Sequence, residues 1–352
     1  MKKFGAIVTR LIDGENLSYQ EVRDCFLQII ENRQTEMQQG AFLAAITAKG
    51  PTGEEIRAIM DSILDHDTNT VAPDVDGPIV ESSGTGMDAI KTFNISTGAS
   101  IVASACGVVI ARHASRGLTS PCGAVDIAEK LGIDVEAPVG VIKNSIERAG
   151  IGIFNGGSPN VHPNALARIL SQISFGSVLN TAASLANPAR PTHAVRGVRA
   201  SNMVAPVAQI MHDIGCRRAV VVHGLQDNGR DGLDEAGTIG ETIYAELRED
   251  GTITEGRFVP EDFGLSRAAP GDIRQLGGAD TECVRLTAVI EGHGTQAESE
   301  IVALNSALIQ YVAGIVSSLN DGVERSIDAM RSGLAARKLR QWVNAQGARE
   351  TA

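Results

Sequence analysis

The 352-residue sequence is poor in aromatic residues and in cysteine, and it has no long apolar run. Phe, Trp and Tyr make up only 3% of the chain, so its core must be built from Ala, Val, Ile and Leu. The most apolar stretch, around residues 101–111, is too short to span a bilayer and predicts a buried helix that leads into a strand. Five scattered cysteines lack the spacing of a metal site or a disulfide framework, which is typical of a reducing, cytoplasmic environment.

An excess of positive charge is also missing. The formal net charge of −11 argues against a nucleic-acid-binding surface, although it leaves room for a local basic patch. With 43% hydrophobic and 21% charged residues, the composition is that of an ordinary globular protein. The length of 352 residues indicates about two domains.

Residues 1–70 predict a small helical bundle. Ser18, Thr35 and Thr52 each stand three residues before a Glu or Gln, which is the signature of a capping box at the start of a helix. The helical patterns that follow end near residues 32, 48 and 64. The next segment, residues 65–77, contains a proline and several acidic residues and predicts a linker.

From residue 78 onward, short β-branched runs alternate with helical patterns. This alternation predicts an α/β domain over residues 78–352, with helices on the faces of a sheet. Residues 250–294 are rich in turns and predict short antiparallel strands. The predicted strands lie at 78–80, 108–110, 151–153 and 219–222, and the predicted helices near 96–106, 124–131, 141–148, 204–214 and 298–330.

A glycine-rich turn between the first of these strands and the first of these helices carries the strongest chemical signal. Residues 83–88 read Ser-Gly-Thr-Gly-Met-Asp, and residues 91–97 read Lys-Thr-Phe-Asn-Ile-Ser-Thr. Backbone N–H groups at such a turn, together with the helix dipole, favour an anion. A tight turn with a Ser-Thr cap would explain part of the pattern, but the added acid and amide favour phosphate binding. The turn does not match a dinucleotide site, because no ribose-binding acid stands about 20 residues further on. It does not match a P-loop either, because no Gly-Lys-Ser/Thr follows.

Two further clusters follow strands. Arg112 and Arg116 come directly after the second predicted strand, where open α/β sheets bind ligands, and arginine matches phosphate geometry. Asp231, Asp234 and Glu235 come after the last one, and adjacent carboxylates suit a hard cation such as Mg²⁺. Either cluster alone would be explained as a solvated surface. Beside a phosphate site they favour ligand binding.

Together these segments resemble the anthranilate phosphoribosyltransferase family, which belongs to a wider class that includes pyrimidine nucleoside phosphorylases. The family's G-T-G-G-D loop, T-F-N-I-S-T segment, K-H-G-N run and D-G-L-D-E motif all have counterparts here in the same order, two of them altered. The resemblance covers nearly the whole chain. It implies a helical domain (residues 1–70, joined by helices near 160–176) and a larger α/β domain (78–352) with a central, mostly parallel sheet.

The resemblance also implies a reaction, the transfer of 5-phosphoribose from phosphoribosyl pyrophosphate to a nitrogen nucleophile. The expected protein is a cytoplasmic, Mg²⁺-dependent homodimer without a membrane or nucleic-acid partner. By the same resemblance, Ser96, Asp234 and Glu235 would carry Mg²⁺. The residues implied for the donor are Gly84, Thr85, Gly86, Asp88, Thr92, Asn94, Ser96, Thr97, Arg112 and Ser120.

The half of the site that would bind the acceptor departs from the family pattern. Leu170 and Gly176 stand where the family has arginines, and the segment 153–163 is longer and more polar than its counterpart. We therefore expect an aromatic or heterocyclic amine that is not anthranilate. The residues expected to contact it are His113, Ser115, Asn155 and Arg168.

The donor half departs in fewer places. Met87 replaces the second glycine of the family's loop, and Arg112 replaces its usual lysine. His-Ala-Ser at residues 113–115 replaces His-Gly-Asn. Two alternatives stay open: a nucleoside phosphorylase-like enzyme that uses inorganic phosphate, and a non-catalytic relative that binds phosphates or nucleic acid.

Overall fold

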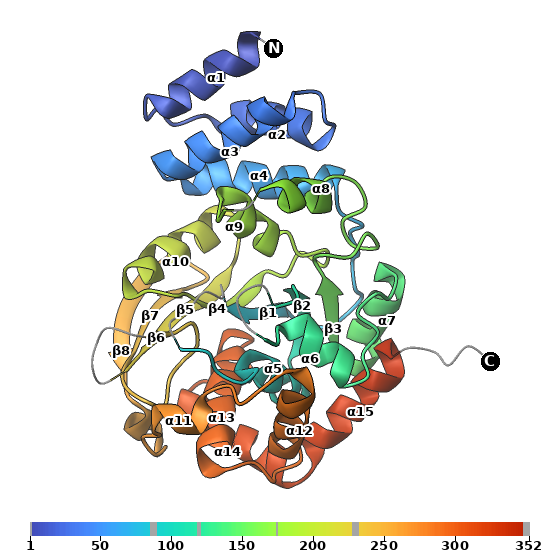
Figure 1. Ribbon diagram of the computed structural model, residues 1–352. Coiled ribbons are helices and arrows are strands. Elements are labelled where there is room, and N and C mark those ends of the chain that lie inside the picture. The colour runs from blue at the N-terminus through green and yellow to red at the C-terminus, as the bar shows by residue number, and fades with distance from the viewer. Residues whose placement is uncertain (1, 85–89, 118–120, 174, 227–231, 348–352) are drawn as a thin grey trace, which may run out of the picture.

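The computed structural model describes residues 2–84, 90–117, 121–173, 175–226 and 232–347. A helical layer made of α1 (Lys2–Ile12), α2 (Tyr19–Ile30), α3 (Glu36–Lys49) and α4 (Gly53–His66) lies over one side of a larger α/β body (Figure 1). Ser18 and Thr52 form complete capping boxes with Glu21 and Glu55, whereas Thr35 only accepts the backbone N–H of Gln38. These caps explain why the starts of α2 to α4 can be predicted from the sequence.

Two helices from the middle of the chain complete the apolar core of this layer. Leu166, Ile169, Val178 and Leu179, from α8 (Leu166–Gln172) and α9 (Val178–Leu185), are buried in the same cluster as the apolar residues of α2 to α4. The carboxylate of Asp67, just after α4, accepts hydrogen bonds from the backbone N–H groups of residues 164–166 at 2.6–2.9 Å. The linker is thereby joined to the start of α8.

The sheet of the α/β body has the strand order β3-β2-β1-β4-β5-β7-β8, and β6 pairs with β5. The strands β1 to β5 run parallel, and β6, β7 and β8 are antiparallel to their neighbours. Their bounds are β1 (Ile79–Gly84), β2 (Val109–Ala114), β3 (Ile151–Asn155), β4 (His193–Gly197), β5 (Arg218–Leu225), β6 (Gly232–Leu233), β7 (Thr242–Leu247) and β8 (Ile253–Phe258).

Alternate residues of the central strands face two different layers. Val80, Val195 and Val220 lie in the main core, which includes the apolar side chains of α5 and α13. Ala194 and Val221 point the other way and pack against α10. The remaining helices are α5 (Ile95–Ala105), α6 (Ala124–Lys130), α7 (Val139–Ala149), α10 (Val204–Asp213), α11 (Pro270–Ile273), α12 (Ala279–Ile290), α13 (Gln296–Val312), α14 (Leu319–Arg331) and α15 (Leu334–Gln346).

The structure corrects two expectations about the elements. The helix predicted over 298–330 is two helices, because Gly314 adopts a φ of 74° after α13 and Ser318 caps a new helix, α14. The region 250–294 contains β8, but its second half forms α12 rather than strands. The sequence patterns also do not predict α1 or β4. Within the described residues, no helix is long and apolar enough to span a membrane.

Candidate active site

The side chain of Arg112 holds the first residues of α5 in place through hydrogen bonds. This side chain is buried, with an exposed fraction of 2%. Nη1 donates to Thr97 Oγ1 at 2.6 Å, Nη2 to Ser96 Oγ at 3.2 Å, and Nε to the carbonyl oxygen of Ser82 at 3.2 Å. Burial lowers the pKa of Arg112, and the nearby carboxylates of Glu235 and Glu81 oppose that shift. A fixed cation therefore lies below a helix N-terminus, an arrangement that attracts phosphate.

The two acidic residues that follow β6 lie against this helix start. Glu235 Oε1 accepts the backbone N–H of Ser96 at 3.2 Å. A Cβ at Gly84 would lie 2.2 Å from Asp234 Oδ2, and one at Gly197 would lie 1.5 Å from the Asp234 carbonyl oxygen. Only glycine at these two positions lets the acidic loop lie on the ends of β1 and β4. The structure thus brings together Ser96, Asp234 and Glu235, the set expected to bind a metal.

This set fits a magnesium ion in its chemistry. Two carboxylates and a hydroxyl are hard oxygen ligands, and Mg²⁺ commonly binds one or two carboxylates together with oxygens of a substrate phosphate. In the described part of the chain, no three His, Cys, Asp or Glu side chains are grouped as a metal site. The protein ligands present would therefore hold the ion only together with other oxygen donors, such as those of a bound phosphate.

The other residues expected to bind the donor are partly placed. Asn94 is the N-cap residue of α5 and accepts a hydrogen bond from Cys122 Sγ at 3.5 Å, and Thr92 forms a β-bridge with Arg274. Gly84 ends β1. Thr85, Gly86, Asp88, Ser120 and the substituted Met87 lie outside the described residues.

On the opposite face of β2, His113 and His162 form a buried pair. His162 Nε2 lies 3.2 Å from His113 Nε2, and His162 Nδ1 lies 2.8 Å from the carbonyl oxygen of Asp67. A carbonyl only accepts, so the network places the His162 proton on Nδ1 and makes His113 Nε2 the donor. Burial is the main cause that lowers the pKa of His113 to about 3, and it lowers the pKa of His162 as well. Both rings are therefore neutral at physiological pH, and His113 Nδ1 has no hydrogen-bond partner among the described residues.

Three of the four residues expected to contact the acceptor already have structural partners or lie at the surface. Asn155 is buried at the end of β3, where Nδ2 donates to Glu136 and Oδ1 accepts the N–H of Gly157. Ser115 is exposed. The guanidinium of Arg168 points into the helical layer and donates to Gln39 Oε1 and to the Ile29 carbonyl. Their contact with an acceptor stays a prediction.

Sequence reasoning missed two buried charged residues on this same face. Glu81 stands in β1 and Arg196 in β4, both within strands that are otherwise mostly apolar or small. Burial raises the pKa of Glu81 to about 7, although Arg196 and other groups oppose that rise. A single charged residue inside a short apolar strand is the signal that could have drawn attention to each. Arg116 is expected from the sequence to neutralise phosphate together with Arg112. It is instead paired with Asp126 and Glu129.

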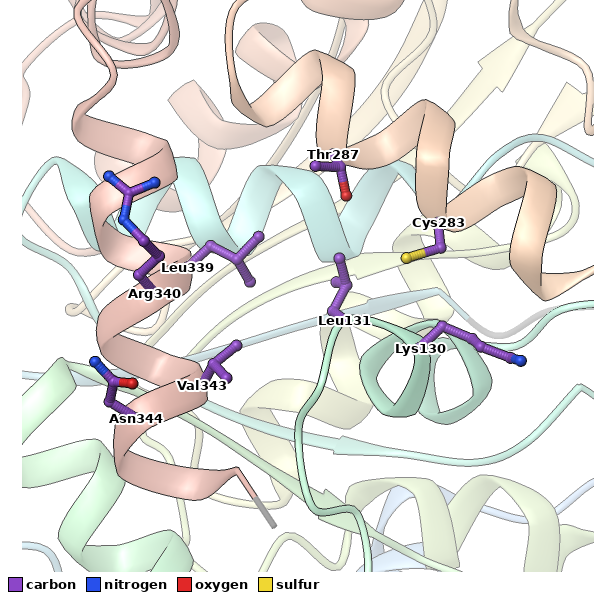
Figure 2. A pocket seen from close by; sticks show the side chains of 8 residues that line it. All are labelled: Lys130, Leu131, Cys283, Thr287, Leu339, Arg340, Val343 and Asn344. Carbon is purple, nitrogen blue, oxygen red and sulfur yellow. The ribbon is translucent and has the colours of Figure 1, made fainter. Parts of the chain in front are cut away.

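A groove on the outer surface lies apart from these residues. It has a volume of about 330 Å³ and lies between α6, α12 and α15, with Leu131, Leu339 and Val343 forming its apolar part (Figure 2). Lys130 and Arg340 stand at its edges. None of the residues expected to bind donor, acceptor or metal lines it.

Comparison with known proteins identifies the family. Residues 76–336 match the "Glycosyl transferase family, a/b domain" and residues 6–67 match the "Glycosyl transferase family, helical bundle domain". The anthranilate phosphoribosyltransferase of Haloarcula marismortui is 35% identical over 342 residues, which cover 96% of this chain and 99% of the relative. The chain belongs to the anthranilate phosphoribosyltransferase family. It is therefore an enzyme of the pentosyltransferase class.

Other members of the anthranilate phosphoribosyltransferase family agree. The enzyme of Methanopyrus kandleri is 34% identical over 351 residues, covering 96% of this chain and 99% of that protein. The crystal structure of the Thermus thermophilus enzyme superposes with a TM-score of 0.86 at 28% identity, covering 96% of this chain and 98% of that one. The Saccharomyces cerevisiae enzyme, solved with PRPP and Mg, shares the fold with a TM-score of 0.83 at 20% identity, covering 98% of each chain. These findings confirm the predicted fold class. The relatives' names give no support to the expectation that the acceptor differs from anthranilate.

Proposed function

We propose that this enzyme transfers 5-phosphoribose from phosphoribosyl pyrophosphate to the nitrogen of an aromatic or heterocyclic amine, with Mg²⁺. The observation that carries the proposal is the meeting of the α5 N-terminus, the buried cation Arg112 and the acidic pair Asp234 and Glu235. An anion site and a hard-cation site side by side suit a substrate that has both phosphate and pyrophosphate groups. The yeast relative was solved with this donor and this metal.

In the proposed reaction, the bond between ribose C1 and the pyrophosphate oxygen breaks and a bond between C1 and the amine nitrogen forms. Pyrophosphate leaves with the bonding electron pair, and the amine releases one proton. Mg²⁺, when bound, would stabilise the charge that grows on the pyrophosphate. Arg112 holds the hydroxyls of Ser96 and Thr97 in place, so the groups at the start of α5 are already oriented before the substrate arrives.

On the acceptor side, we propose that His113 accepts a hydrogen bond from the amine through Nδ1. Its partner His162 is fixed by the Asp67 carbonyl, which leaves Nδ1 as the unprotonated nitrogen of a neutral ring. A ring whose pKa is lowered to about 3 is a weak base, so this contact orients the amine rather than removing its proton. A cytoplasmic location and a homodimer stay predictions.

The function is tested by following pyrophosphate release from phosphoribosyl pyrophosphate while a panel of aromatic and heterocyclic amines is added, with and without Mg²⁺. We expect release that depends on both an amine and Mg²⁺. If no amine is used, calorimetry with the donor alone shows whether the protein still binds phosphoribosyl pyrophosphate. No donor binding in either condition would reject the proposal. Phosphate-dependent cleavage of a nucleoside would instead favour the phosphorylase-like alternative.

A further inference from the structure

Arg196 is a buried cation that has no carboxylate within ion-pair distance among the described residues. The side chain has an exposed fraction of only 5%. Nη1 donates to Ser83 Oγ at 2.9 Å, and Nη2 donates to Ser184 Oγ. No ion pair within 4.0 Å involves this guanidinium anywhere in the described residues. Arg285, another buried arginine, is by contrast paired with the carboxylate of Glu298. Burying a charge without a partner is costly, which is why buried charges are normally paired.

The position of Arg196 lies between the two halves of the candidate site. In the parallel pairing of β1 with β4, Arg196 is opposite Ser83, the residue before the glycine that ends β1. Ser184 stands in the last turn of α9, and its backbone carbonyl is close enough to His113 to raise the pKa of that ring slightly against the effect of burial. The guanidinium is therefore held between the donor turn and the residues proposed for the acceptor.

Arg196 lies on the opposite face of the sheet from Arg112 and the start of α5, where phosphate is expected to bind. Arg112 and Ser82 lie on the face that packs against α5, as the hydrogen bonds of Arg112 to Ser82, Ser96 and Thr97 show. His113 follows Arg112 in β2 and Ser83 follows Ser82 in β1, so both point to the other face, toward α9. Arg196 bonds to Ser83 on that face. Arg196 therefore lies on the acceptor side of the sheet, whereas Arg112 lies on the donor side.

Two carboxylates, those of Glu81 and Asp234, act electrostatically on Arg196, and Glu81 shares its face of the sheet. Its carboxylate lies farther than 4.0 Å from the guanidinium, since no ion pair joins these two described residues. One Glu81 oxygen, Oε1, has no hydrogen-bond partner among the described residues. Burial favours the protonated form of Glu81, which leaves the positive charge of Arg196 only partly compensated.

We propose that Arg196 binds an anionic group of the acceptor, most simply a carboxylate, and so takes over from the arginines that the family places near α8 and α9. This inference rests on the proposed phosphoribosyl transfer and adds the residue in this chain that would bind the acidic group of the acceptor. Ser83 and Ser184 position the guanidinium, whose planar fork matches a carboxylate.

Calorimetry on the full chain, saturated with Mg²⁺ and pyrophosphate, tests the proposal with 2-, 3- and 4-aminobenzoate and their uncharged amides. We expect at least one acid to bind tenfold or more tightly than its amide. Arg196→Gln should reduce that ratio to less than twofold, and Arg196→Lys should keep part of it. Arg217→Met, which removes an exposed arginine from the residue just before β5, is the matched control and should leave the ratio unchanged.

A measurement of donor binding distinguishes failure of this proposal from failure of the proposed phosphoribosyl transfer. Calorimetry with phosphoribosyl pyrophosphate and Mg²⁺ should give affinities within threefold for the parent and both Arg196 variants, and failure of the parent to bind would reject the phosphoribosyltransferase itself. With donor binding intact, equal binding of acids and amides, or no binding of any acid, would overturn the role of Arg196. So would an acid preference that survives in Arg196→Gln. Should that variant not fold, a Lys variant with an undiminished acid preference would overturn the two-pronged binding by the guanidinium.

Discussion

The carboxylate of Glu235 accepts a hydrogen bond from the backbone N–H of Ser96 at 3.2 Å, and so joins two segments that are 139 residues apart in the sequence. The contact places a carboxylate at the positive end of α5, where an N–H group has no partner within the helix. A bound phosphate would occupy the same end of the helix. The acidic pair and the donor therefore have to share this position, which a cation between them would allow.

Removal of one acid should weaken the donor only when metal is present. We expect Asp234→Asn to lower the affinity for phosphoribosyl pyrophosphate at least tenfold with Mg²⁺, or about 1.4 kcal/mol, because one hard ligand is lost. The affinity without Mg²⁺ should hardly change. Calorimetry in both conditions measures this difference, and Asp280→Asn, which alters an exposed acid on α12, is the control. If donor affinity in the parent does not depend on metal at all, the metal role of Asp234 and Glu235 is rejected.

A methyl group at Gly197 should displace the acidic loop. A Cβ there would lie 1.5 Å from the carbonyl oxygen of Asp234, a distance that the backbone must open. We expect Gly197→Ala to lower the free energy of unfolding by about 1–3 kcal/mol and to lose Mg²⁺-dependent donor binding. Gly140→Ala, in α7 with open space around it, is the matched control and should be neutral or slightly stabilising. A Gly197→Ala protein with parental stability and donor affinity would contradict this role of Gly197.

Glu81 should make the fold less stable as the pH rises. Its pKa is raised from 4.5 to about 7 by burial, so the folded state keeps its proton over a range in which the unfolded chain has lost it. The free energy of unfolding therefore falls as the pH rises from about 4.5 through about 7. Denaturant unfolding at pH 5 and pH 8 should show a decrease that is smaller in Glu81→Gln than in the parent by about 2 kcal/mol.

The exposed Glu324 on α14 supplies the control for this pH experiment. Glu324→Gln removes the same charge from the surface and should follow the parent at both pH values. An identical pH dependence in the parent and in Glu81→Gln would mean that Glu81 is ionised in the folded protein. Glu81 would then be a charge partner for Arg196, which would weaken the case for an anionic acceptor.

The grouping of hydroxyls and an arginine at the start of α5 could be predicted from the sequence, because local chemistry determines it, and its role in binding the donor stays a prediction. Capping boxes fix the helix starts, and hydroxyls at a helix start beside a glycine turn indicate an anion site before any tertiary contact is known. The contact of Glu235 with Ser96 also follows the family's order of motifs. Only the structure shows how Gly84 and Gly197 make that approach possible.

The acceptor half could not be predicted in the same way, because it depends on which face of a strand each side chain takes. His113 and Arg112 are neighbours in the sequence, yet they point to opposite faces of β2. Arg168 lies close to the family's arginine positions in the sequence, but its guanidinium bonds to Gln39 and Ile29 in the helical layer. Arg196 stands in β4, a strand that the sequence patterns do not predict.

Met87 should reshape the donor turn without blocking it. The family's glycine at this place would allow backbone N–H groups to approach pyrophosphate closely, whereas methionine is bulkier but flexible enough to turn aside. We expect Met87→Gly to change donor affinity by less than tenfold, or about 1.4 kcal/mol, in calorimetry. A glycine variant that gains donor binding absent from the parent would show that Met87 blocks the site. That result would favour a binding protein repurposed from the enzyme.

Anthranilate itself should be a poor acceptor. Leu170 packs partly against the core of the helical layer and Gly176 is exposed, so neither supplies the cation that the family has at these positions. A carboxylate placed there would lose its hydration without gaining a charged partner. Steady-state kinetics with saturating donor and Mg²⁺ should give a kcat/KM for anthranilate below roughly 10⁴ M⁻¹s⁻¹, and below that of another acidic aromatic amine. A higher value that falls in Arg196→Gln but not in Arg217→Met would mean that Arg196 binds the ortho carboxylate, and that the acceptor is the one named in the relatives.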